Sequence, residues 1–135
     1  MAKILVIDDD PDIALATRLI LEGEGYTVIE AHSSQEGLAA VRQHVPDLIV
    51  LDVMMETPTA GFQTALTLRD PAPNAEFAAY RHIPIILLTA IHQTTPMRFS
   101  PDENYLPVDA FVEKPIIPVT FLRTVKALLA EKQVG

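Results

Sequence analysis

Five polar side chains in this sequence stand where short apolar runs end, and their types suit chemistry on a charged group. Asp8 and Asp9 follow the first run, Asp52 follows the third, and Thr89 and Lys114 follow the last two. A continuous apolar run of this length is typical of a strand buried on both faces of a parallel sheet. Such sheets bind ligands at the carboxyl ends of their strands. The pattern therefore predicts that the five side chains gather at one edge of a sheet.

The three carboxylates of this group predict a divalent cation. Asp8, Asp9 and Asp52 would repel one another at a shared edge. Mg²⁺ relieves such repulsion, because it prefers a few carboxylate oxygens with water completing its octahedron. A hydroxyl and an ammonium beside the ion suit the spread negative charge of a phosphoryl group, and an aspartate can itself be the nucleophile. The residues thus predict Mg²⁺-dependent phosphoryl transfer onto a carboxylate.

The elements that would position these side chains alternate along the chain. Apolar runs predict five strands, at residues 4–7, 26–31, 47–51, 84–88 and 109–113, the second being more polar and so nearer an edge. Helix signals predict helices over 11–23, from 33 to before Pro46, over about 62–69 and from Pro118 onward, with a short turn within 75–81 and a proline-interrupted stretch at 91–107. This order predicts a single doubly wound α/β domain with a five-stranded parallel sheet and about five helices.

Chain length, net charge and amino-acid composition limit the class of protein. A chain of 135 residues fits one domain, and we expect a single domain over residues 1–135. A net charge of −8 argues against nucleic acid as a direct partner, and the lack of cysteine excludes disulfides and thiolate metal sites. The apolar runs are too short to span a bilayer, and the N-terminus lacks the pattern of a signal peptide. We therefore expect a cytoplasmic protein with no membrane partner.

Simpler interpretations exist for several residues. Asp10 before Pro11 is typical of a helix N-cap, with no chemical role. Met54 and Met55 are of the type that fills cores, although Met54 could still offer its backbone carbonyl. The histidines show no metal-ligand spacing and are expected at the surface or at element edges: His32, His44, His82 and His92.

Four stretches of the chain together resemble the receiver domain of response regulators, the chemotaxis-type receivers of two-component signalling. They are residues 3–11 (KILVIDDDP), 47–55 (DLIVLDVMM), 84–90 (PIILLTA) and 111–115 (FVEKP), and they occur in the family's order. The resemblance implies a flavodoxin-like fold with strand order 2-1-3-4-5.

The resemblance also implies roles for the site residues. Asp52 matches the phospho-acceptor, which receives its phosphoryl group from a sensor histidine kinase or a phosphotransfer protein. Asp9 matches the direct Mg²⁺ ligand, Asp8 the ligand that acts through water, and Met54 the ligand that offers its backbone carbonyl. Lys114 matches the lysine that pairs with the acyl phosphate. Such a domain is a signalling protein and not an enzyme, since it catalyses only its own phosphorylation and dephosphorylation.

Two further residues match the family's switch. Thr89 corresponds to the hydroxyl that moves toward the phosphoryl group, and Phe111 to the aromatic ring that turns inward with it. The Lys114–Pro115 bond matches the family's cis-proline position. Their motions imply that the output face is built from the fourth helix, the fifth strand and the fifth helix.

The sequence also departs from the family pattern. Glu56 replaces the usual proline four residues after the acceptor, and the loop to Gly61 is one residue longer than usual. Extra residues lie around 71–81, and the fourth-helix region is long and proline-broken. These departures predict a remodelled output face.

The positions two residues after the acceptor and after the switch hydroxyl are both apolar. They are Met54 and Ile91. Neither side chain can orient an attacking water, so we predict slow loss of phosphate from Asp52.

Two other functions compete with a phosphorylated stand-alone receiver. The first is a pseudo-receiver that acts as a protein-interaction module without phosphorylation, and the intact set of five polar residues argues against it. The second is an aspartyl-phosphate hydrolase, which needs a second acid where this chain has Met54. No output domain is expected, and the sequence leaves open the kinase, the downstream target and whether a homodimer forms.

Overall fold

The computed structural model describes residues 2–55, 57, 60–70, 72, 74–90 and 108–134. Its elements run in the order β1 (Lys3–Ile7), α1 (Pro11–Glu22), β2 (Thr27–Ala31), α2 (Ser34–His44), β3 (Leu48–Asp52), α3 (Ala60–Leu68), the 3₁₀ helix η1 (Ala78–Tyr80), β4 (Ile85–Ala90), β5 (Ala110–Lys114) and α4 (Pro118–Val134). The predicted stretch at 91–107 lies outside the described residues.

The five strands form one parallel sheet in the order β2-β1-β3-β4-β5, so the predicted fold is confirmed. Strands β1, β3 and β4 are continuous apolar runs because helices cover both of their faces. Strand β2 is only half-buried, and it is an outer strand of the sheet, as its more polar sequence predicted.

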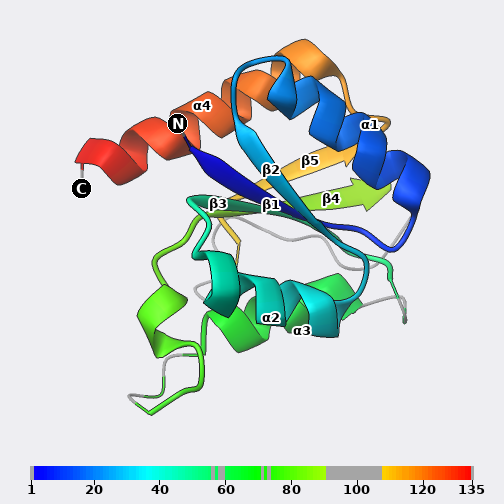
Figure 1. Ribbon diagram of the computed structural model, residues 1–135. Coiled ribbons are helices and arrows are strands. Elements are labelled where there is room, and N and C mark those ends of the chain that lie inside the picture. Colours follow the sequence, from blue (N-terminus) through cyan, green and yellow to red (C-terminus); the bar gives the residue numbers. More distant parts are fainter. Residues whose placement is uncertain are drawn as a thin grey trace.

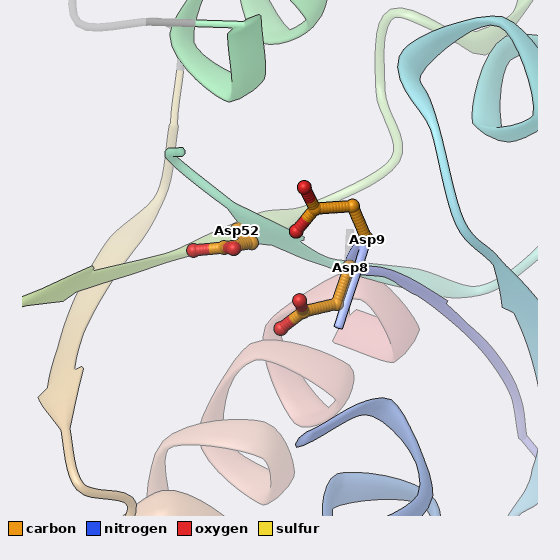
Figure 2. A group of neighbouring side chains, drawn as sticks. All are labelled: Asp8, Asp9 and Asp52. Atoms are coloured by element: carbon orange, nitrogen blue, oxygen red, sulfur yellow. The ribbon is translucent and has the colours of Figure 1, made fainter. Parts of the chain in front are cut away.

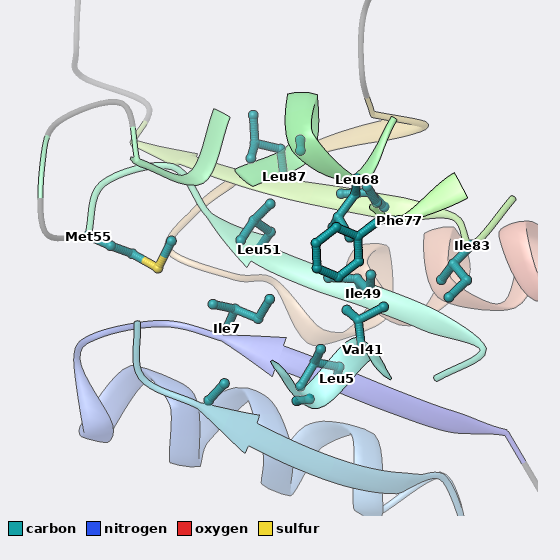
Figure 3. Packing of buried hydrophobic residues seen from close by; sticks show 14 of the residues in the cluster. Leu5, Ile7, Val41, Ile49, Leu51, Met55, Leu68, Phe77, Ile83 and Leu87 are labelled. Atoms are coloured by element: carbon teal, nitrogen blue, oxygen red, sulfur yellow. The ribbon is translucent and has the colours of Figure 1, made fainter. Parts of the chain in front are cut away.

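The helices cover the sheet in two layers (Figure 1). Helices α1 and α4 lie on one face and pack on a buried cluster that includes Phe121, while α2 and α3 lie on the other face. The cluster under α2 and α3 contains Leu51, Phe77 and Met55 (Figure 3). In the described part of the chain, no helix has both the length and the apolar character that crossing a membrane requires.

The helix N-caps follow the sequence signals. Asp10 Oδ1 accepts hydrogen bonds from the N–H groups of Asp12 and Ile13, which confirms Asp10 as the cap of α1. Ser33 Oγ accepts from the N–H of Glu36 at the start of α2. The Glu36 carboxylate in turn accepts from the N–H of His32.

Some boundaries differ by one or two residues from those predicted. Strands β3 and β5 start one residue later, because Asp47 and Asp109 each use a side-chain oxygen to accept an N–H of the neighbouring strand. Helix α3 begins at Ala60, two residues earlier than predicted. The described residues hold four α-helices, and the predicted turn within 75–81 is the 3₁₀ helix η1.

The methionines and histidines can also be placed. Met55 is buried in the core as expected of a core-filling residue, whereas Met54 is 38% exposed and is not core. His32 and His82 are exposed and His44 is partly exposed, while His92 lies outside the described residues.

Candidate functional site

Three aspartates meet at the carboxyl edge of the sheet (Figure 2). Ile7 pairs with Leu51 across β1 and β3, so the residues that follow, Asp8 and Asp52, lie side by side. One carboxylate oxygen from each of Asp8, Asp9 and Asp52 lies within 4.8 Å of the other two. Asp8 is fully buried and Asp52 is 4% exposed, while Asp9 lies on the surface. The three carboxylates therefore form an acidic pocket of which Asp9 is the solvent-exposed member.

Lys114, the last residue of β5, brings a positive charge into this pocket. Its Nζ donates a hydrogen bond to Asp52 Oδ1 at 2.8 Å and lies 3.9 Å from Asp8 Oδ2. The pairing of β5 with β4 and of β4 with β3 carries Lys114 to the same edge as Asp52. The ammonium thus offsets part of the repulsion between two buried carboxylates.

Asp8 is the least satisfied group of the pocket. Its Oδ1 accepts the N–H of Asp10 at 3.0 Å, but its buried Oδ2 has no hydrogen-bond partner among the described residues. Burial raises the pKa of the Asp8 carboxyl from 3.8 to about 6, and the Asp52 charge acts in the same direction, against the Asp10 N–H and Lys114.

An oxygen left without a partner in a cluster of three carboxylates fits a hard cation. Mg²⁺ takes carboxylate and carbonyl oxygens and keeps several waters, which the exposed side of the pocket can supply. Receiver domains bind Mg²⁺ at such an acidic pocket, and Asp8, Asp9 and Asp52 are the residues here that would hold it.

The other predicted residues can be placed by their elements. Thr89 stands one residue beyond Leu88, the pairing partner of Asp52, and is partly exposed. Phe111 is half-buried against the core cluster under α2 and α3. Met54 follows Asp52 in the loop toward α3. Ile91 and Glu56 lie outside the described residues.

Sequence reasoning did not identify two residues that contact this region. Gly61 packs against the backbone of Asp52, and Met55 anchors the loop that carries Met54. A glycine in the first turn of a helix, where a residue with a side chain would favour the helix more, was the available signal for the first.

Comparison with known proteins gives relatives that match most of this chain. PilH of Pseudomonas aeruginosa is 32% identical over 96% of this chain and 99% of its own length. The polar-differentiation response regulator DivK of Brucella ovis is 29% identical over 97% of this chain and 99% of its own length. The DNA-binding transcriptional regulator RpaA of Synechocystis is 35% identical over 96% of this chain, which spans only 49% of RpaA.

Solved structures agree with the fold and the family. A CheY-like receiver domain protein from Methanospirillum hungatei is matched over 100% of this chain and 99% of its own, with 26% identity and a TM-score of 0.74. CheY4 of Vibrio cholerae is matched over 95% of this chain and 98% of its own, with 28% identity and a TM-score of 0.75. Residues 4–126 match the response regulator receiver domain, and the chain belongs to this family of two-component signalling proteins.

Proposed function

We propose that the protein accepts a phosphoryl group on the carboxylate of Asp52 in a Mg²⁺-dependent reaction. The observation that carries the proposal is the position of the Lys114 ammonium, 2.8 Å from Asp52 Oδ1, beside a cluster of three carboxylates. A structural ion pair would not need the two further carboxylates, one of which is buried with an oxygen that accepts no hydrogen bond from the described residues.

The transfer is a displacement at phosphorus. A carboxylate oxygen of Asp52 forms a bond to the phosphorus of a phosphohistidine, the P–N bond breaks, and the imidazole leaves with the electron pair and takes up a proton. Asp8, Asp9, Asp52 and the Met54 carbonyl would hold the cation, and Mg²⁺ when bound would supply positive charge beside the phosphoryl oxygens. Lys114 releases Asp52 and pairs with the new acyl phosphate.

The phosphorylated state is read out by the switch residues. The Thr89 hydroxyl donates a hydrogen bond to the phosphoryl group, and Phe111 moves into the space this leaves beside the core. The result is a changed surface over β5 and α4 that a downstream protein binds. In the same proposal, this changed surface can also bind a second copy of the chain to form a homodimer.

The donor is a sensor histidine kinase or a phosphotransfer protein, and the reaction takes place in the cytoplasm. The match to nearly the whole length of PilH and DivK supports a receiver that acts through protein contacts and not by binding DNA. The net charge of −8 agrees with that choice of partner.

The test is intact mass after incubation with Mg²⁺ and a small acyl-phosphate donor. We expect one added phosphoryl group in the wild type, and none in Asp52→Asn or in the presence of a chelator. Asp47→Asn is the matched control, because Asp47 lies at the opposite end of β3 and its amide keeps an oxygen for the Lys3 N–H. If the wild type is not phosphorylated under conditions in which another receiver is, the proposal is overturned in favour of a pseudo-receiver.

A further inference from the structure

The backbone that follows Asp52 is tied to two neighbouring elements. The N–H of Val53 donates to the carbonyl oxygen of Leu88 in β4 at 3.1 Å, which extends the sheet ladder by one residue. The carbonyl oxygen of Val53 accepts the N–H of Gly61 in the first turn of α3 at 2.9 Å. The peptide groups on both sides of Val53 are therefore fixed, and with them the direction in which β3 ends.

Gly61 lies so close to this backbone that no side chain fits. A Cβ atom at position 61 would be 1.8 Å from the carbonyl oxygen of Asp52 and 2.7 Å from both the Asp52 carbonyl carbon and the Val53 Cα. These atoms are backbone, so no rotamer change relieves the contact. Any larger residue would move either α3 or the residue that carries the acceptor carboxylate.

The loop between β3 and α3 has a second attachment, at Met55. Its side chain is 9% exposed and belongs to the same buried cluster as Ile7 and Leu51, at the end of the cluster in Figure 3. Its N–H donates to the carbonyl of Thr57 at 3.1 Å. Met54 lies between the two attachments, with its side chain 38% exposed.

We propose that Gly61 and the buried side chain of Met55 are positioning residues for phosphoryl transfer. Gly61 lets α3 pack directly on the Asp52 backbone and so sets where the Asp52 carboxylate lies relative to Asp8, Asp9 and Lys114. Met55 anchors the loop from which the Met54 carbonyl would bind the cation. The inference rests on the proposed function, because it assigns parts to the same site.

The first test compares two glycine variants. Gly61→Ala places a methyl group against the Asp52 backbone, whereas in Gly37→Ala the three nearest atoms all belong to the Ile7 side chain, at 2.5, 2.9 and 3.1 Å, and none to the backbone. Both glycines are buried in helices, so both variants are expected to lower Tm. Since a misplacement of about 1 Å costs roughly 100-fold in rate, we expect Gly61→Ala to slow phosphorylation by about that factor and Gly37→Ala to keep the wild-type rate.

The second test uses Met55 and does not depend on whether Gly61→Ala folds. Met55→Ala and Leu68→Ala each remove a buried side chain from the same cluster. We expect Met55→Ala to weaken Mg²⁺ binding by about tenfold, as the loss of groups that orient metal ligands commonly does, and Met55→Leu to restore it. Leu68→Ala should lower Tm at least as far and keep the wild-type affinity.

Calorimetric titration of the unphosphorylated protein with Mg²⁺ supplies a readout that does not depend on phosphorylation, and hydrogen exchange at the Val53 amide supplies another. Each is measured below the Tm of every variant. Wild type that neither binds Mg²⁺ nor is phosphorylated refutes the proposed function. Active wild type with equal affinity and rate in Met55→Ala and Leu68→Ala refutes the positioning role alone.

Discussion

An aspartate pairs with a cation at each edge of the sheet, and the two pairs are built differently. At the carboxyl edge, Lys114 donates to Asp52 beside the buried Asp8 Oδ2, which has no hydrogen-bond partner among the described residues. At the opposite edge, Arg69 donates to Asp109 and also to the carbonyls of Arg81 and Ile83.

The hydrogen bonds of the Arg69–Asp109 pair all connect parts of the fold to one another. Asp109 Oδ2 also accepts the N–H of Ile85, so one carboxylate just before β5 holds both the residue after α3 and the first residue of β4. The extra residues before β4 are held there too, by Phe77 in the core and by the Arg81 guanidinium on the carbonyls of Asp70 and Ala72. The comparison teaches that an ion pair whose hydrogen bonds all hold the fold marks structure, while a buried carboxylate oxygen without a hydrogen bond marks a place where a ligand can bind.

The largest expected effect is on stability at the structural edge. Asp109→Ala leaves the buried N–H of Ile85 without its acceptor and leaves Arg69, whose pKa burial already lowers, without its counter-charge. We expect the free energy of unfolding to fall by about 1–3 kcal/mol, mainly because the Ile85 N–H loses its acceptor, since Asp109 is partly exposed and water screens its charge. Urea unfolding measures it, and Mg²⁺ affinity should stay at the wild-type value. A tenfold loss of that affinity would mean that the two edges are not independent.

The pocket should respond in the opposite sense. Asp8→Asn keeps an oxygen for the Asp10 N–H and removes a buried charge beside Asp52, so we expect the metal-free protein to gain about 2 kcal/mol at pH 7. Mg²⁺ affinity should fall by roughly 10- to 100-fold. Chemical unfolding in chelator and calorimetric titration give the two values. A destabilised Asp8→Asn would show that the carboxylate is part of the structure after all.

The pH dependence sharpens the same contrast. The pKa of Asp8 is about 6 when folded and near 3.8 when unfolded, so the folded state binds the extra proton between these values. Stability of the metal-free protein should therefore rise as pH falls from 7 toward 5, by about 1 kcal/mol more in wild type than in Asp8→Asn. Unfolding curves of both proteins at the two pH values measure the difference, and parallel pH profiles would contradict it.

The two edges were also not equally predictable from the sequence. The strands were readable because β1, β3 and β4 are buried on both faces, and the pocket followed because parallel strands end at one edge. The Arg69–Asp109 pair was not predicted, because its residues are 40 positions apart and either is ordinary on a surface. The contact of Gly61 with Asp52 depends on how closely α3 approaches β3, which no local pattern reports.

A substitution at position 54 gives the smallest effect we expect. It changes how fast Asp52 loses its phosphoryl group and not how the pocket binds Mg²⁺. In the proposed function Met54 would offer its backbone carbonyl to the cation, while its apolar side chain is 38% exposed. An amide there can hydrogen-bond a water near the acyl phosphate, so Met54→Asn should shorten the lifetime of phosphorylated Asp52 by about three- to tenfold.

Met54→Leu, which stays apolar, is the control and should keep the long lifetime. Loss of phosphate followed by intact mass, after the donor is removed, measures all three proteins. A wild-type lifetime of seconds would show that groups other than the side chain at position 54 orient the water that attacks the acyl phosphate.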